Sequence, residues 1–220
     1  MKPSFRRLLV VLFLIGTMPG IALAARNGNI CDQAAEMAAR ESGVPVDVLK
    51  AITRVEAGRS TGAGFSGWPW TVNQGGAGSF FDTKAAAMDH VSRAIESGET
   101  NIDIGCFRIN IRWHGRAFPS LEAMFDPDEN ARYAASFLQR LRDETGEWEA
   151  AIGAYHSRRD AAAQGYLAKV VQVMDDLPAP GQAPLTVPRS GSYPLFGGGG
   201  GTLGSLVAGD ARAATAPLLR

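Results

Sequence analysis

Apolar residues recur at helical spacing along most of the chain between residues 28 and 177. In the segment 48–56, Leu49, Ile52 and Glu56 stand at positions i, i+3 and i+7 and therefore share one helix face. The opposite face, which we expect to meet solvent, carries Lys50, Thr53 and Arg54. Proline is favoured in the first turn of a helix, so the pattern predicts a helix from about Pro45 to Glu56.

The same spacing predicts further helices along the chain. They are expected over residues 32–42, 83–97, from 126–130 onward, around 148–155 and over about 160–174. Gly43 can end the first of these, and Asp82 can cap the helix that starts at Thr83. Residues 102–113 alternate and are rich in β-branched and aromatic side chains, which predicts short extended pieces. The stretch 58–81, rich in glycine and aromatics, is expected to be a loop, so the fold class is mainly α with a small β segment.

The two ends of the chain differ from this pattern. Residues 1–24 combine a positively charged start, the apolar run Leu8–Ile15 and the cleavage motif Ala22-Leu23-Ala24, which predicts a secretory signal peptide. The alternative is an uncleaved membrane anchor, although the apolar run is short for a span. We therefore expect a periplasmic protein that is cleaved after Ala24.

From Pro178 onward the composition changes. Six prolines and the run Gly197–Gly201 punctuate residues 178–220, and such a segment buries too little apolar surface to offset its ordering entropy. The sequence thus predicts three parts: a signal peptide over residues 1–24, one folded domain over 25–177 and a disordered tail over 178–220.

Charge narrows the range of partners. The chain has 22 basic and 22 acidic side chains, and removal of residues 1–24 takes away three basic ones and no acidic one. The resulting excess of acidic groups argues against nucleic acid, which requires a basic surface. We expect a monomer that uses no cofactor. No metal site is predicted either, because two cysteines and the scattered His90, His114 and His156 lack ligand spacing.

Two cysteines are present, Cys31 and Cys106, both beyond the predicted cleavage site. In an oxidising compartment an isolated pair favours a disulfide, which here would join the start of the first helix to the middle of the domain. Two buried free thiols are the alternative.

Glu56 is the main candidate for chemistry. A carboxyl group beside an apolar stripe on the last turn of a helix is desolvated and meets the negative end of the helix dipole, and both effects raise its pKa. Such a group can hold a proton near neutral pH and act as a general acid. The alternative is an exposed glutamate at a fraying helix end.

Four segments in order carry a family resemblance: the helix ending in Glu56, then Gly105-Cys-Phe-Arg-Ile-Asn110, then Asn130 at the opening of a helix, then Ala151-Ile-Gly-Ala-Tyr155-His-Ser. Together they resemble the SLT-type lytic transglycosylases, peptidoglycan-cleaving enzymes with a goose-type-lysozyme-like fold. The resemblance covers roughly residues 30 to 160 and implies a lysozyme-like α+β domain. The stretch Gly67–Asn73 is also similar to a subgroup of small exported transglycosylases.

Three positions depart from the family pattern. Ala57 stands where the family usually has serine, Arg108 where it has glutamine, and Tyr155-His-Ser-Arg158 where it has Tyr-Asn-Ala-Gly. Arg108 can contact sugar hydroxyls or a peptide carboxylate, but its charge also lowers the pKa of a nearby Glu56.

The resemblance implies a mechanism with one carboxyl group. Glu56 first protonates the glycosidic oxygen and then acts as base while the muramyl 6-hydroxyl attacks C1, which leaves a 1,6-anhydromuramyl end. Substrate-binding roles fall to Phe107, Arg108, Asn110 and Tyr155, with core packing as the alternative for Phe107 and Tyr155; for Tyr155 we favour the site, because a buried hydroxyl needs a polar partner. No second carboxylate is identified, because Asp82 and Asp103 are interpreted as a helix cap and a turn residue.

Other functions stay open on the sequence alone. A muramidase on the same fold would use water in place of the 6-hydroxyl, and a non-catalytic peptidoglycan-binding assembly factor would explain Ala57 and Arg108 as signs of decay. The substrate implied is the peptidoglycan glycan strand, and Trp68, Trp70 and Trp113 either stack on sugars or cover the core. A role in opening the wall for a flagellum or secretion apparatus is expected, with the tail either as a tether or docking segment for that envelope-spanning machine or as an idle extension.

Overall fold

The computed structural model describes residues 19–62 and 64–178, and for residues 19–28 it describes the backbone only. The predictions for residues 1–18 and for the tail over 179–220 therefore lie outside the described residues. Within the described helices, no segment combines the length and the apolar character needed to cross a membrane.

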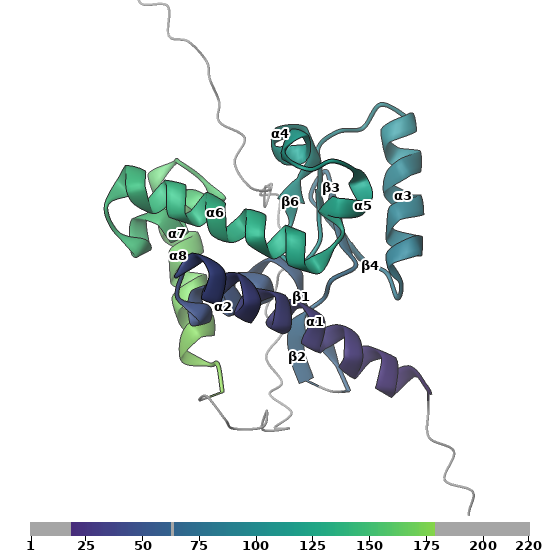
Figure 1. Cartoon of the computed structure of the whole chain (residues 1–220), viewed down its shortest axis with the longest axis horizontal. Helices are drawn as coiled ribbons and strands as arrows, with labels where there is room; N and C mark the ends of the chain where they lie inside the picture. The colour runs from purple at the N-terminus through teal and green to yellow at the C-terminus, as the bar shows by residue number, and fades with distance from the viewer. Residues whose placement is uncertain (1–18, 63, 179–220) are drawn as a thin grey trace, which may run out of the picture.

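Helices make up most of the described chain, as the sequence predicts (Figure 1). They are α1 (Pro19–Ser42), α2 (Val46–Ala57), α3 (Lys84–Glu96), α4 (Ile111–His114), α5 (Leu121–Met124), α6 (Pro127–Thr145), α7 (Trp148–His156) and α8 (Asp160–Asp175), with a 3-10 turn at Gly115–Ala117. The expected mainly α class with a small sheet is confirmed.

In the described residues, six short strands form two antiparallel sheets. β1 (Gly58–Thr61) pairs with β2 (Gly64–Gly67), and a four-stranded sheet has the order β4-β3-β5-β6. Its strands are β3 (Thr71–Gln74), β4 (Ala77–Phe80), β5 (Ile102–Ile104) and β6 (Ile109–Asn110). The prediction of a loop over residues 58–81 is therefore wrong. Strands of four residues with many glycines lack a clear alternating pattern, and their pairing partners, not local propensity, stabilise them.

Two helix starts differ from the sequence prediction. Helix α1 begins at Pro19, well before the expected Asp32. The N-cap of α3 is Thr83, whose hydroxyl accepts from the Ala86 N–H at 3.2 Å, and Asp82 instead lies 3.6 Å from an Arg59 nitrogen. The interpretation of Asp82 as the helix cap is therefore wrong, because a threonine directly follows it and takes that role.

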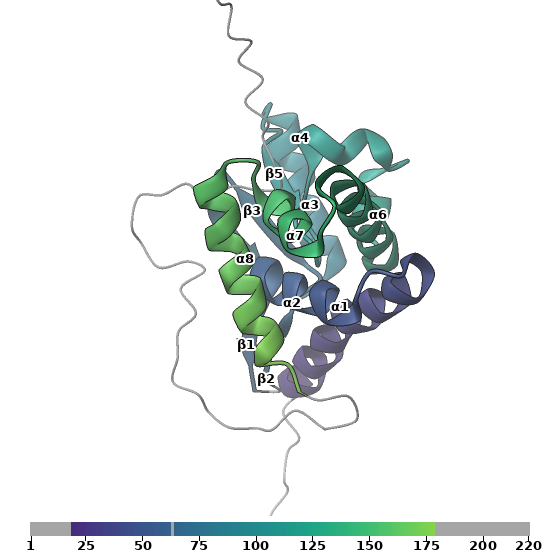
Figure 2. The same cartoon turned by 90° about the vertical axis from the view of Figure 1, so that its left-hand side faces the viewer.

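Helix α2 lies at the centre of the helical part, packed against α1 and α8 (Figure 2). Its predicted solvent-facing side is largely buried: Thr53 is inaccessible, and Arg54 makes a two-point ion pair with Asp32 of α1 at 2.8 and 2.9 Å. The polar face is thus an interface between helices. α6 covers α1 and α7 on one side, while α3 packs on the sheet at the far side of the molecule (Figure 1).

The expected disulfide is confirmed. The Cys31 and Cys106 sulfurs are 2.11 Å apart, and the bond joins α1 to the turn that follows β5. It ties the helical part to the sheet close to the residues of the candidate site. The end of α2 lies at the same junction, so Glu56 faces the point where helices and sheet meet.

Candidate active site

Glu56 is the penultimate residue of α2 and is only 6% exposed. Burial raises the pKa of its carboxyl group, and the negative charge of Asp103 adds to this, whereas the positive charges of Arg108 and Lys169 act in the opposite direction. The alternative of an exposed glutamate at a fraying end is excluded. The direction of the pKa shift is the one predicted from the helix pattern.

Arg108 lies between two buried carboxyl groups. One guanidinium nitrogen is 3.8 Å from a Glu56 carboxyl oxygen, and the other is 3.7 Å from Asp103. The Arg108 Nε is buried and has no hydrogen-bond partner within the described residues. Its backbone has φ of 48°, a left-handed conformation that is unusual for a residue with a side chain. The guanidinium is therefore held in the site with one donor unused.

Asp103 is a functional residue that the sequence interpretation missed. It is not in a turn but in strand β5, it is 1% exposed, and its charge acts on Glu56. Asn73 donates to one of its oxygens and Asn110 to the other, both at 2.7 Å. The isolated charge in an alternating segment was the available signal, but only the pairing of β5 with β3 and β6 brings these amides to it.

The turn that carries Arg108 is held by Asn130 of α6. The Asn130 side chain accepts from the Phe107 N–H at 3.0 Å and donates to the carbonyls of Ile104 and Met124 at 3.3 and 3.1 Å. Gly105 has φ of 82°, and a Cβ there would lie 2.6 Å from the Asn130 amide nitrogen. The turn can therefore approach Asn130 this closely only because residue 105 is glycine.

Two predicted substrate-binding residues are buried. Phe107 is in the core with no exposed surface, which agrees with the core-packing alternative. Asn110 is also inaccessible, and besides holding Asp103 it caps α4 by accepting from the Trp113 N–H at 3.3 Å. The expectation that these two side chains line a glycan groove is not met, because neither has surface to offer a ligand.

Tyr155 of α7 comes close enough to Glu56 for their charges to interact, but it is fully buried. Its hydroxyl donates to the Phe107 carbonyl at 3.1 Å. Burial, followed by the charge of Glu56, raises the pKa of Tyr155 well above its usual range, so the hydroxyl stays protonated. In this arrangement Tyr155 fixes the turn next to Arg108 instead of presenting a free hydroxyl to a ligand.

Tyr166 of α8 is a second residue that the sequence interpretation missed. Its hydroxyl approaches Glu56 and lowers the pKa of that carboxyl group, yet no hydrogen bond of ordinary geometry joins the two side chains. The His156 ring stacks on Tyr166 at 4.7 Å. The signal in the sequence was the spacing of Tyr166, Val170 and Val173, which places a hydroxyl on the buried face of the last helix.

The three tryptophans occupy different environments. Trp68 is 2% exposed, donates to the Phe81 carbonyl at 2.6 Å and has the Arg59 guanidinium 4.2 Å from its ring. Trp70 packs partly buried against the core. Trp113 is 44% exposed and is the most accessible of the three to a sugar.

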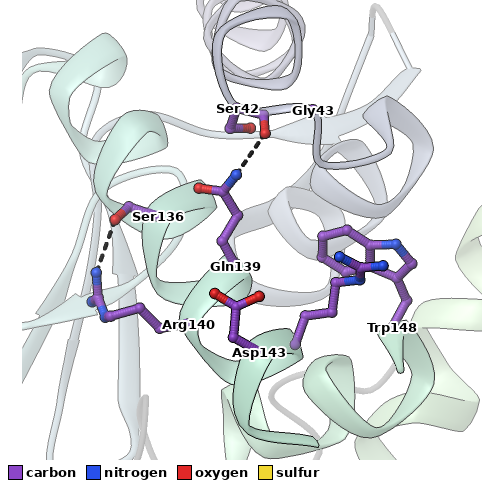
Figure 3. Close-up of a pocket in the computed structure, with 8 residues that line it drawn as sticks. Ser42, Gly43, Ser136, Gln139, Arg140, Asp143 and Trp148 are labelled. Atoms are coloured by element: carbon purple, nitrogen blue, oxygen red, sulfur yellow. Dashed lines mark hydrogen bonds between the residues drawn. The ribbon is translucent and has the colours of Figure 1, made fainter. Parts of the chain in front are cut away.

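A separate cavity of about 300 Å³ lies between the end of α1 and helices α6 and α7 (Figure 3). Gln139 spans it and donates to the Ser42 carbonyl at 2.6 Å, and Arg140 donates to Ser136. None of the residues around Glu56 lines this cavity, so it is not the candidate site. In the described part of the chain, no group of three His, Cys, Asp or Glu side chains is arranged to hold a metal ion.

The fold and the site define a class: a mainly helical protein with a small sheet and a buried glutamate of raised pKa at the helix–sheet junction. Comparison with protein families confirms the resemblance to SLT-type lytic transglycosylases, because residues 89–166 match the Transglycosylase SLT domain. The match contains Asp103, Arg108 and Tyr155 but begins after Glu56. It supports lytic transglycosylase activity on peptidoglycan in general. No curated protein and no solved structure matches the chain.

Proposed function

We propose that this protein is a lytic transglycosylase that cleaves the β-1,4 bond between N-acetylmuramic acid and N-acetylglucosamine and leaves 1,6-anhydromuramyl ends. The observation that carries the proposal is Glu56, a buried carboxyl group with a raised pKa, in a chain that contains an SLT domain. A carboxyl group that holds its proton near neutral pH can protonate a leaving oxygen.

Two proton transfers complete the reaction with Glu56 alone. Its carboxyl proton goes to the glycosidic oxygen as the bond from that oxygen to C1 breaks. The carboxylate then takes the proton of the muramyl 6-hydroxyl as its oxygen bonds to C1. The proton count on Glu56 is restored and no water is consumed, so the product is an intramolecular acetal that bridges C1 and C6.

Asp103 does not supply the second carboxylate that most glycosidases use. One of its oxygens accepts from Asn110, and the other accepts from Asn73 and faces Arg108. With 1% exposure it has no surface on which to activate a water or attack a sugar. Because both oxygens of Asp103 are occupied, the site favours a reaction with one working carboxyl group over a reaction with two.

Arg108 and Tyr166 are the proposed donors to the substrate. The Arg108 Nε and the Tyr166 hydroxyl are buried polar groups without hydrogen-bond partners in the described structure. Unpaired buried donors are costly, and a ligand oxygen that accepts from them removes that cost. Arg108 lowers the pKa of Glu56 through its charge, and the Tyr166 hydroxyl lowers it as a neighbouring hydrogen-bonding group, so both donors lie next to the group that transfers the proton.

The test is Glu56→Gln in purified protein acting on peptidoglycan sacculi. Glutamine keeps the size of the side chain but holds no transferable proton, so fragment release should fall about 10²–10⁴-fold or more. The exposed Glu122→Gln, which loses only a surface ion pair at 3.3 Å, should keep full activity. Mass spectrometry should find wild-type fragments lighter by one water than hydrolysed ones.

Other outcomes of the same experiment assign other functions. Hydrated reducing ends would identify a muramidase. Sacculus binding without any fragment release by the wild type would identify a non-catalytic assembly factor. Undiminished release by Glu56→Gln would contradict the mechanism.

The cellular setting is proposed from the sequence. A signal peptide over residues 1–24 would export the chain to the periplasm, the catalytic domain would span 25–177, and the tail over 178–220 would recruit it to an envelope-spanning machine. Local opening of the wall for a flagellum or secretion apparatus is the corresponding role.

A further inference from the structure

Three charged side chains form a row in the interior beside α2: Glu56, Arg108 and Asp103. Arg108 is 3.8 Å from the first carboxyl group and 3.7 Å from the second, both longer than a hydrogen bond. All three side chains are less than a tenth exposed. The guanidinium therefore lies about midway between two carboxyl groups and closes on neither.

Asp103 is the fixed end of this row. The amides of Asn73 on β3 and Asn110 on β6 hold its two oxygens at 2.7 Å, so its position is set by the sheet. Glu56 is fixed at the other end by α2. The backbone of Arg108 is set by the turn between β5 and β6, where its N–H donates to the Gly105 carbonyl at 3.2 Å. Because the arginine side chain is long, its guanidinium can lie closer to either of the two carboxyl groups.

We propose that Asp103 is a positioning residue: its carboxylate draws the Arg108 guanidinium toward the sheet and so prevents a closed ion pair with Glu56. Glu56 then keeps its proton, and the Arg108 Nε stays free to donate to a carbonyl oxygen of the glycan. An uncharged acceptor such as this carbonyl oxygen fits the site, because the positive charge of Arg108 is already balanced by the negative charge of Asp103 and Glu56 is protonated. The proposal rests on the proposed function in that Glu56 is taken as the acid.

The charges around Glu56 show why this restraint is needed. Arg108 on the turn and Lys169 on α8 favour its ionised form, and Asp103 on the sheet opposes them. Tyr155 and Tyr166 also face it but stay neutral, because burial raises both of their pKa values well above the usual range. Without Asp103 two cations would act unopposed, and Arg108 could close on Glu56.

The experiment compares Asp103→Asn, Arg108→Gln and the double variant. Glutamine at 108 is the usual residue of the family that this chain resembles. The titration of Glu56 is followed by NMR of ¹³C-carboxyl-labelled glutamate, assigned with Glu56→Gln, and the pH dependence of fragment release from sacculi is measured in parallel. NMR reports on Glu56 without any substrate.

The two single variants should move in opposite directions. Asp103→Asn removes the charge that raises the pKa of Glu56 and frees Arg108, so the titration and the alkaline limb of activity should shift to lower pH. Activity lost at neutral pH should return as the pH is lowered. Arg108→Gln removes the charge that lowers the pKa of Glu56, so the titration of Glu56 and the alkaline limb of activity should both shift to higher pH. In the double variant the pKa of Glu56 should lie between its values in the two single variants.

Folding of each variant is checked by its melting temperature, with the exposed Asp89→Asn as the matched control that leaves the titration unchanged. Asp103→Asn can be accommodated because Asn73 has an unpartnered Oδ1 that can accept from the new amide after a flip. If Asp103→Asn does not fold, the shift to higher pH in Arg108→Gln must still appear.

An unchanged or raised pKa of Glu56 in folded Asp103→Asn would overturn the proposal. A lower pKa of Glu56 in Arg108→Gln would overturn it as well. A wild type that releases no fragments would instead contradict the proposed function while the NMR titrations still decide the role of Asp103. The two failures are thus distinguishable.

Discussion

At the scale of single residues, Asn130 connects three segments around the site through the hydrogen bonds of its side chain. Its amide bonds to the backbone at Ile104, Phe107 and Met124, which belong to β5, the turn and α5. Each of these backbone groups is buried and needs a partner. Asn130 therefore fixes the conformation of the turn that contains Arg108. It does so from within α6, whose N-cap is Asp126.

We predict that Asn130→Ala weakens both stability and activity. Its removal leaves a buried N–H and two carbonyls with fewer partners, each costing about 1–3 kcal/mol, and frees the turn that holds Arg108. Ser136→Ala, at an exposed position of the same helix, should change the free energy of unfolding by less than about 0.5 kcal/mol. Urea unfolding and fragment release measure the two effects. Normal activity in a destabilised Asn130→Ala would show that the turn needs no support from α6.

At the scale of elements, the junction between α2 and β1 positions Glu56. The chain leaves the helix at Gly58 in an extended conformation and continues directly as β1, which pairs with β2. A Cβ at position 58 would overlap the Arg54 carbonyl oxygen and the Phe65 ring. The close approach of the hairpin to the last turn of α2 therefore requires glycine, and this packing sets the position of the turn that carries Glu56.

We predict that Gly58→Ala moves the hairpin away from α2 and destabilises the protein by about 1–3 kcal/mol, the usual cost of overpacking. Glu56 should become more exposed, so its pKa should fall toward the ordinary value and activity at neutral pH should drop. Gly62→Ala in the same hairpin, where a Cβ meets no atom within 4 Å, is the matched control. Thermal unfolding together with the pH dependence of activity tests this. Equal stability of the two variants would contradict it.

At the scale of the whole molecule, the disulfide connects residues 75 positions apart. It joins α1 of the helical part to the turn between β5 and β6, two residues before Arg108. A cross-link over so long a loop restricts the unfolded chain strongly. It also holds the two parts together at the point where Glu56 meets Arg108 and Asp103.

We predict that Cys31→Ser/Cys106→Ser lowers the free energy of unfolding by about 4 kcal/mol, the loop-entropy value for a separation of this size. Reduction of the wild type should lower its melting temperature to about that of the double variant. The double variant should show no further change on addition of reductant, which is the internal control. A reductant effect on the double variant, or none on the wild type, would show that the bond does not stabilise the fold.

The sequence by itself determined the main helices, the disulfide pair and Glu56 as the central carboxyl group. Each follows from a local signal: 3.6-residue periodicity, the count of cysteines, and a glutamate on the apolar side of a helix end. The four motifs that carry the family resemblance stand in the family's order along the chain. That order is unaffected by the unusual residues at Ala57 and Arg108, so the resemblance could be recognised from the sequence.

Only the tertiary structure decided how the site is assembled. Asp103 became a partner of Arg108 because β3 and β6 pair on either side of β5, and Tyr166 reached Glu56 because α8 packs along α2. Phe107 and Asn110 turned inward for the same reason, as the turn between β5 and β6 closes onto Asn130. These contacts join residues tens of positions apart. Local propensity carries no information on such pairings, because they form only when the packing of helices on the sheet brings the residues together.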